Sequence, residues 1–226
     1  MTNEWSGQLW LGRDYGLILG ETGRTAPHAH YAHQFILSSD SPVTVSLDGH
    51  LHTACRLFIP SRQSHAIVHT QGNVLMAYVE PGAFDAQALQ HALDAADFGL
   101  ESFEQTLRRL PRRRADDARV QRALLTLDQQ LSGKVSAQSL AQAAHLSLSQ
   151  LERLFVSQLG VPVRRLVMWR RLRMALDLAL NGNTLTEAAH GAGFADSAHF
   201  SRTMKQLFGV TAGASLRHLQ VHLLPL

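Results

Sequence analysis

The stretch Ala189-His-Gly-Ala-Gly-Phe194, followed by residues 197–208 and then Gly209, decides the fold of the carboxy-terminal half. A stretch of the same form, Ala141-Gln-Ala-Ala-His-Leu146 with residues 147–159 and Gly160, lies earlier in the chain. Ala189 lies 48 residues after Ala141, whereas Gly209 lies 49 residues after Gly160, so the second turn has one extra residue. The sequence therefore predicts a duplicated helix-turn-helix.

The ends of these segments carry the residue types that begin and end helices. Ser147 with Gln150, and Thr184 with Glu187, have the spacing of capping boxes. Gly160 and Gly209 stand where a left-handed helix end is expected. An ordinary helical bundle would use the same caps, but the repeat and the basic charge favour the helix-turn-helix. The residues expected to face the core are Leu151, Leu154, Phe155, Phe200, Met204 and Phe208.

Charge is divided unevenly along the chain of 226 residues, whose formal net charge is +3. Residues 1–106 hold four basic and eleven acidic residues, and residues 107–226 hold seventeen basic and seven acidic ones. This division indicates that the second half binds a polyanion and the first half does not.

The tail of the chain resembles the AraC family of transcription regulators. The similar signature is Gly193-Phe194-Ala-Asp-Ser-Ala-His-Phe-Ser-Arg-Thr-Met-Lys-Gln-Leu-Phe-Gly-Val-Thr211, and the Arg-rich helix expected over 166–180 is similar to the family's linker helix. Met204 and Ala212 depart from the family pattern at packing positions. The resemblance covers about residues 117–218 and implies sequence-specific binding to double-stranded promoter DNA, with RNA polymerase as a further partner.

The resemblance also implies which side chains meet DNA. Arginine can hold guanine with two hydrogen bonds and glutamate can accept from cytosine, whereas phosphate contacts position the protein without reading bases. For Arg153 and Arg202 the alternative is a solvated surface charge. The residues expected to face bases are Ser149, Glu152, Arg153, Ala198, His199 and Arg202, and those expected to touch phosphates are Gln150, Ser197, Ser201 and Lys205.

The amino-terminal part predicts β-structure, so the fold class is an α+β chain of two domains. Asp48-Gly49 between the alternating runs 43–47 and 50–54 is a strong hairpin signal, because both residues tolerate positive φ. Further strands are expected over 16–20, 34–37, 56–59 and 74–79. The predicted domains are a cupin-like effector-sensing β-domain (1–82), linking helices (83–110) and an all-helical DNA-binding domain (111–226).

Two histidine clusters resemble the motifs of the cupin barrel. The segment His28-Ala-His30-Tyr-Ala-His-Gln34 resembles the first motif, and Pro60-Ser-Arg-Gln-Ser-His65 resembles the second. If His28, His30 and Gln34 share one face of a strand, they can converge with His65 on a divalent transition metal. Gln34 replaces the motif's carboxylate, so the alternative is that these histidines line an organic-ligand pocket or satisfy buried hydrogen bonds.

An apolar stripe follows Pro81-Gly82 and predicts a helix that ends near Gly99, then a shorter helix over 101–110. By family analogy these helices mediate a homodimer, although such a stripe packs as often on its own domain. Pro111-Arg-Arg-Arg114 is expected to be a hinge, and everything from Asp116 onward to be helical.

Three functions are compatible with these patterns. The first is a transcription regulator whose β-domain senses a small molecule or metal ion, and the second is a metal-dependent cupin dioxygenase or isomerase with a helical appendage. The third is an architectural DNA binder without a ligand. The regulator is preferred over an enzyme because no nucleophile–base pair or phosphate-binding loop is visible. No secretory signal or membrane span is visible, and the single cysteine, Cys55, is expected to be small and buried, so a cytoplasmic protein is expected.

Overall fold

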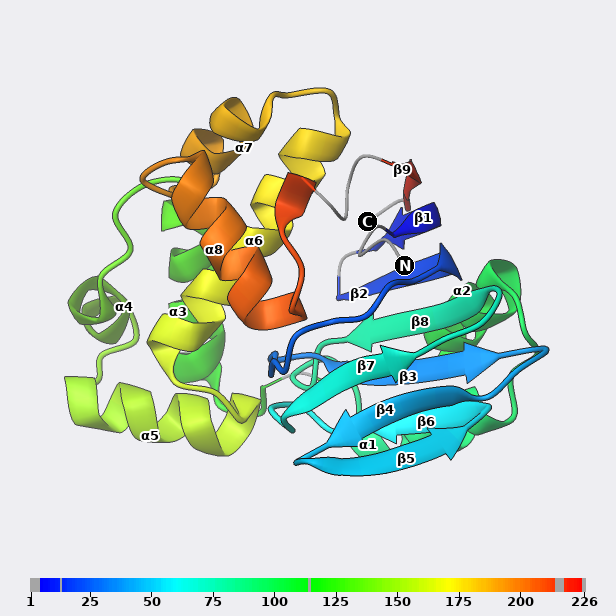
Figure 1. Cartoon of the computed structure of the whole chain (residues 1–226). Coiled ribbons are helices and arrows are strands. Elements are labelled where there is room, and N and C mark those ends of the chain that lie inside the picture. The colour runs from blue at the N-terminus through cyan, green and yellow to red at the C-terminus, as the bar shows by residue number, and fades with distance from the viewer. Residues whose placement is uncertain (1–4, 13, 114, 214–217, 225–226) are drawn as a thin grey trace. The chain divides into compact units, whose positions relative to one another are not determined.

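The computed structural model describes residues 5–12, 14–113, 115–213 and 218–224 (Figure 1). The chain forms two compact units, one of Met1–Arg112 with Ser201–Leu226 and the other of Arg113–Phe200. The first unit thus includes residues 111–112 and 201–226, which the sequence had grouped with the DNA-binding domain of 111–226.

Two sheets form the β-structure of the first unit (Figure 1). The larger has the order β6-β3-β8-β2-β1-β9 and the smaller the order β5-β4-β7. Strand β8 is buried along its whole length because it lies inside the larger sheet, between β3 and β2. The strands are β1 (Ser6–Leu11), β2 (Tyr15–Glu21), β3 (His33–Ser38), β4 (Val43–Leu47), β5 (His50–Ala54), β6 (Arg56–Ile59), β7 (His65–His69), β8 (Val74–Val79) and β9 (His218–Leu223).

The predicted hairpin is present. β4 pairs with β5 in antiparallel register, and Asp48 and Gly49 between them both have positive φ, 47° and 90°. The other expected strands correspond to β2, β3, β6 and β8.

The expectation that everything after Asp116 is helical is wrong. Strand β9 lies parallel to β1, with Ser6 opposite His218 and Leu11 opposite Leu223. A strand from the carboxy-terminal segment therefore completes one edge of the sheet that the amino-terminal residues begin.

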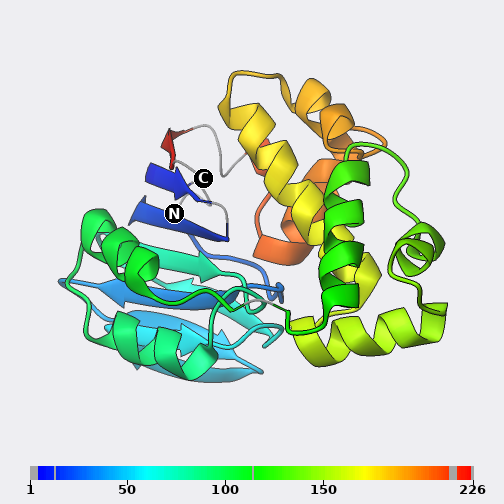
Figure 2. The same cartoon turned by 180° about the vertical axis from the view of Figure 1, so that it is seen from behind.

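Helices α1 (Ala86–Asp94) and α2 (Leu100–Arg109) cover one face of the larger sheet, as the view from behind shows (Figure 2). Their apolar stripe, which includes Phe84, Leu93 and Phe103, forms one core cluster with sheet residues such as Phe35. The apolar stripe is thus buried against its own domain. This was the alternative to a role in a dimer interface. Gly99 does not end the first helix as expected, because α1 already ends at Asp94 and Gly99 is the N-cap of α2.

Arg112 is fixed in the first unit, although the sequence placed it in a hinge. Its guanidinium donates to Leu107 O and Leu110 O, at 2.7 and 3.1 Å, and pairs with Asp14 at 2.9 Å. It also lies 4.4 Å above the centre of the Phe84 ring. Arg114, the last residue of the predicted hinge, lies outside the described residues.

The second unit is helical. It holds α3 (Ala118–Gln130), α4 (Ala137–Ala143), α5 (Leu148–Leu159), α6 (Val163–Leu180), α7 (Leu185–Gly191) and the first residues of α8 (Ser197–Phe208). The fully buried apolar side chains Leu127, Leu140, Phe155 and Leu172 come from four different helices of this unit. As predicted, Gly160 follows α5 in the left-handed region, at φ 71°.

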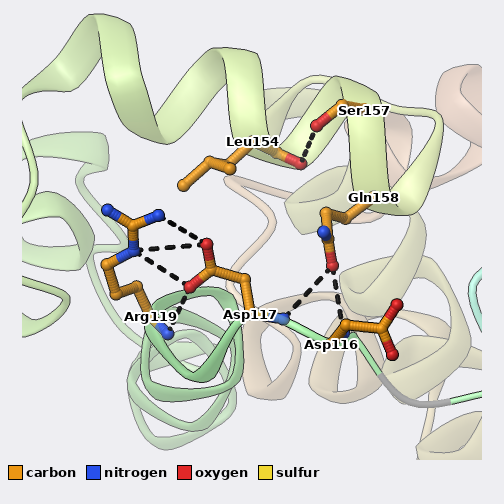
Figure 3. A network of polar contacts seen from close by, with 6 residues as sticks. All are labelled: Asp116, Asp117, Arg119, Leu154, Ser157 and Gln158. Atoms are coloured by element: carbon orange, nitrogen blue, oxygen red, sulfur yellow. Dashed lines mark hydrogen bonds and ion pairs between the residues drawn. The ribbon is translucent and has the colours of Figure 1, made fainter.

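A polar network joins the start of α3 to the last turn of α5 (Figure 3). Gln158 Oε1 accepts from the backbone N–H groups of Asp116 and Asp117, at 3.1 and 3.4 Å. Asp117 caps α3 by accepting from the backbone N–H and the guanidinium of Arg119. These hydrogen bonds from Arg119 lower the pKa of Asp117 to about 2, so its carboxylate stays charged.

Both predicted capping boxes are present. Ser147 Oγ accepts from Gln150 N–H while Gln150 Oε1 accepts from Ser147 N–H, and Thr184 with Glu187 does the same for α7.

We expect Ser147→Ala to lower the free energy of unfolding by about 1 kcal/mol, because the first turn of α5 loses its cap. Urea denaturation of the full chain measures this. Ser157→Ala, at an exposed position late in α5, is the matched control, and equal effects of both variants would contradict the capping role.

Two further expectations concern exposure. Cys55 is exposed, so the expectation of a small buried residue is wrong. Among the residues that the structure describes, no helix is long and apolar enough to cross a membrane.

Candidate functional sites: a duplicated helix-turn-helix and a histidine cluster

The two turns of the helical repeat are built in the same way. Leu146 N–H donates to Ala141 O at 2.8 Å, and 48 residues later Phe194 N–H donates to Ala189 O at 2.9 Å. Ala141 and Ala189 are both buried, which explains the small residue where the chain turns back on the helix. The hydrogen bond shared by the two turns supports the duplication predicted from the sequence.

The residues directly before Leu146 and Phe194 both have a left-handed backbone conformation. Gly193 has φ 78°, and the equivalent residue of the first helix-turn-helix, His145, has φ 54°. Only the glycine gives a sequence signal for this conformation, so the role of His145 was missed. At Gly193 a Cβ atom would also lie 3.0 Å from the guanidinium of Arg171, which donates to Leu131 O and Gly133 O.

In the first helix-turn-helix, the residues predicted to contact DNA separate into those that are only exposed and those that already have a structural role. Ser149 and Arg153 are exposed on α5. Gln150 is exposed but is already engaged in the capping box of α5. Glu152 is half-buried, and its carboxylate accepts from Val163 N–H at 3.3 Å, at the start of α6. Glu152 thus also stabilises the junction between two helices.

In the second helix-turn-helix, Ala198, Arg202 and Lys205 are exposed on α8, whereas Ser197, His199 and Ser201 are half-buried. The ring of His199 packs edge-on against Phe194, 5.2 Å between centres. Asp196 accepts from His199 N–H and so caps the start of α8.

Some arginines of the helical half bind other groups of the protein, and others are exposed without an ion pair. Arg170 forms an ion pair with Asp128, and Arg171 holds the carbonyls after α3. By contrast, within the described part of the chain, Arg153 and Arg202 form no ion pair. Their guanidinium groups are therefore open to an anionic partner.

Three buried histidines meet in the first unit. His28 pairs with His65 in an isolated β-bridge, with N–H···O distances of 2.9 Å in both directions. Ring centres are 4.1 Å apart for His28 and His65, 4.9 Å for His30 and His65, and 5.7 Å for His28 and His30. One ring nitrogen of each lies within 4.8 Å of the other two. The expectation that His28, His30 and Gln34 share one strand is wrong, because β3 begins only at His33; the bridge to β7 brings the histidines together instead.

The hydrogen bonds of the three rings show where the protons of His28 and His65 lie. Each Nδ1 lies 2.9 Å from a backbone carbonyl oxygen, that of Ala26, Ala32 or Gln63 respectively. A carbonyl oxygen can only accept, so Nδ1 of His28 and of His65 carries the proton and Nε2 presents a lone pair. Both ring nitrogens of His30 face carbonyl oxygens, because its Nε2 lies 3.2 Å from Gln34 Oε1. His65 Nε2 is buried and has no hydrogen-bond partner among the described residues. Backbone-anchored Nδ1 atoms and open Nε2 atoms are the arrangement of metal-binding imidazoles.

Gln34, the fourth predicted residue, lies beside the cluster and is 1% exposed. Its Oε1 is 3.2 Å from His30 Nε2, and its Nε2 donates to Tyr78 OH at 3.2 Å. The amide therefore joins the cluster to Tyr78, whose pKa is raised by burial. An amide oxygen can ligate a metal ion as a neutral donor, without the charge that a carboxylate would bring.

Burial keeps these imidazoles uncharged. Loss of solvent lowers the pKa of His28 to about 4 and that of His30 to about 3, with the neighbouring His65 as the second cause in both. Burial also lowers the pKa of His65. Neutral imidazole is the form that binds metal ions.

His33, three residues after His30, shows the same effect outside the cluster. Its Nδ1 accepts from Ser61 N–H at 3.0 Å, its ring stacks on Phe58, and burial lowers its pKa to about 4. The ordinary pKa of histidine is 6.5, and that of His33 in the folded chain is about 4. Between these two pH values His33 binds a proton in the unfolded chain but not in the folded chain. The stabilisation that the neutral, buried ring of His33 provides is therefore complete above pH 6.5 and is lost as the pH falls.

We expect the free energy of unfolding to fall on acidification through this range, and His33→Gln to make the dependence shallower. Denaturation of the full chain at pH 7.5, 6 and 5 measures the slope. The exposed His52, replaced by glutamine, is the control. A slope that His33→Gln leaves unaltered would show that this ring is not the titrating group.

Comparison with known proteins places the helical part in a family. Residues 140–218 match the family model of a helix-turn-helix domain. The probable transcriptional regulator LumQ of Photobacterium leiognathi is 31% identical over 102 residues, which are 42% of this chain and 41% of that protein. The HTH-type transcriptional regulator YidL of Escherichia coli K12 is 31% identical over 104 residues, 46% of this chain and 35% of that protein. The chain thus spans less than half the length of these relatives.

The similarity in fold extends further. A solved structure of a ToxT variant from Vibrio cholerae superposes with a TM-score of 0.58, over 89% of this chain and 96% of that one, at 10% identity. The wild-type protein superposes with a TM-score of 0.55, over 88% of this chain and 93% of that one. A β-rich domain followed by helices and a helix-turn-helix domain is thus a known architecture, while the cupin-like assignment stays a prediction. Residues 140–218 thus form a helix-turn-helix domain that is similar to those of the transcriptional regulators LumQ and YidL.

Proposed function

We propose that this protein is a sequence-specific DNA-binding transcription regulator whose amino-terminal domain senses a small molecule or metal ion at His28, His30, Gln34 and His65. The observation that supports it most is the turn built twice with the same hydrogen bond, each turn leading into a capped helix with an exposed arginine, Arg153 or Arg202. One chain then presents two reading helices to double-stranded promoter DNA.

Contacts with DNA are proposed in two classes. Arg153 and Arg202, with Ser149 and Ala198 beside them, read bases, and Lys205 neutralises a phosphate. Glu152 and His199 remain candidates for base contacts and Gln150 for a phosphate contact, in addition to their structural roles. Ser197 and Ser201 are the remaining phosphate candidates, at half-buried positions.

An enzyme is the alternative, and we propose against it. A metal-dependent oxygenase or isomerase needs room for substrate beside the metal, whereas His30 and His65 are each only 2% exposed. Turnover of an organic substrate by the metal-loaded protein would favour the enzyme.

A cytoplasmic location, a homodimer and contact with RNA polymerase complete the proposal. The core-packed stripe of α1 and α2 is not offered as the dimer surface. Because a helix-turn-helix domain needs only DNA to display its specificity, the other partners are not required for the test below.

The test is selection of binding sites from random DNA duplexes by the full chain, followed by titration of the selected duplex and a shuffled one. We expect the selected duplex to bind about 1,000-fold more tightly or better, and its affinity to fall steeply with salt. Equal affinity for both duplexes would contradict a sequence-specific regulator and favour an architectural role.

A further inference from the structure

The end of α8 lies directly on the histidine cluster, within the same compact unit. The ring of Phe208 is 5.5 Å from the ring of His30 and 5.4 Å from that of Tyr78, measured between centres. Phe208 is 9% exposed, and Val210 and Ala212 after it are buried as well. The last turn of the second reading helix therefore touches the group of side chains that is best suited to bind an effector.

The next residue makes this contact tight. Gly209 has φ 70°, and its carbonyl oxygen accepts from Ala26 N–H at 3.3 Å. A Cβ atom added at Gly209 would lie 2.9 Å from His28 Nδ1 and 2.5 Å from Ala26 O. Glycine is thus required here both by the backbone conformation and by the approach of His28.

A metal ion would have to move these rings. The three ring nitrogens now lie within 4.8 Å of one another. Tetrahedral ligands at about 2.0–2.1 Å from one zinc ion lie roughly 3.3 Å apart. Contraction of the cluster therefore shifts the rings against which Phe208 and Gly209 pack. Because protein interiors are densely packed, such a shift is passed to the contacting residues.

We propose that a divalent transition-metal ion bound through Nε2 of His28, His30 and His65 is the effector, and that Phe208 and Gly209 transmit its binding to α8. Three neutral imidazoles, with Gln34 as a neutral neighbour, suit zinc, nickel, copper or ferrous iron rather than magnesium or calcium. The same helix carries Arg202 and Lys205, so the ion acts on residues proposed to touch DNA. The regulatory half of this inference rests on the proposed function, whereas the metal site does not.

The first measurement is metal binding by the full chain, with Zn²⁺, Ni²⁺, Cu²⁺ or Fe²⁺ added alone and the bound ion counted after gel filtration. We expect one ion per chain in the wild type and in His52→Ala, which alters an exposed histidine, and none in His65→Ala. Absence of stoichiometric metal from the wild type would overturn the inference, while DNA binding by the metal-free protein would leave the proposed function standing.

The second measurement is the affinity for the selected duplex with and without the ion. In the wild type we expect a change of about 5- to 150-fold, the usual range of coupling between two sites. Phe208→Leu keeps all three histidines and leaves the left-handed position at Gly209 untouched, so this variant should bind the ion and yet lose most of this change.

Two outcomes would overturn the transmission step. One is a wild-type response retained in Phe208→Leu, and the other is bound metal without any effect on DNA affinity. If the wild type binds metal but no DNA, the regulator proposal fails with it and only the metal site survives.

Discussion

Alanine in place of Arg153 or Arg202 is expected to weaken binding to the selected duplex by about 1–3 kcal/mol, roughly 5- to 150-fold, and to relax specificity at the base that each side chain is proposed to read. Both guanidinium groups are exposed on capped helices, and neither forms an ion pair within the described residues. Removing either is expected to leave the fold intact and to delete the proposed paired contact to guanine. Fluorescence anisotropy on the selected duplex and its single-base variants measures both effects.

Lys205→Ala serves as the comparison. A phosphate contact carries no sequence information, so this variant should weaken binding to all duplexes alike and reduce the salt dependence by about one ion. Arg170→Ala, which removes a side chain already paired with Asp128, should alter binding much less. If Arg153→Ala and Arg202→Ala weakened the selected and shuffled duplexes equally, base reading by these residues would be refuted.

Phe155→Ala is expected to lower the free energy of unfolding by about 3–5 kcal/mol. The ring is fully buried on the inner face of α5, beside the equally buried Leu151. Its loss leaves a cavity where the reading helix packs on its neighbours, so DNA affinity should fall together with stability. Thermal and urea unfolding followed by circular dichroism measure the change.

The neighbouring residue provides a control for this effect. Val156 is 48% exposed on the same helix. Val156→Ala should leave stability nearly unaltered, because its side chain gains little from burial. Comparable losses in both variants would contradict core packing of Phe155 as the cause, because alanine is a good helix former and should not by itself destabilise α5.

The helical half could be predicted because its signals are local. Each capping box spans four residues, and the repeat places the same turn at the same spacing twice. The turn itself also follows from short-range chemistry, since Ala141 and Leu146 are five residues apart and joined by one hydrogen bond. What remained hidden was the structural use of Glu152, because side-chain partners at a helix junction leave no pattern in the sequence.

The histidine cluster could be predicted in its members but not in its construction. His28 and His30 precede β3, and their approach to His65 depends on a bridge between segments 37 residues apart. Sequence spacing cannot report which carbonyl each Nδ1 meets. The contact with Phe208 was equally invisible, because an apolar residue at helical spacing predicts a helix core and nothing more.

Three strands, β1, β7 and β9, were not predicted. Residues 218–223 alternate polar and apolar side chains, His-Leu-Gln-Val-His-Leu, which is a strand pattern that the surrounding helical signals concealed. Residues 6–11 alternate only weakly, and their strand depends on its partners β2 and β9. Cys55, for its part, lies at the corner between β5 and β6, where a small residue gains no burial.

The parallel pairing of β1 with β9 has a consequence during synthesis. Ser6 leaves the ribosome long before its partner His218, by about 10–40 seconds at ~5–20 residues per second. Throughout that interval the β1 edge of the nascent sheet presents unpaired backbone groups, which invite pairing with other chains. Protection of this strand edge during synthesis would therefore matter more for this protein than for one whose first sheet is complete early.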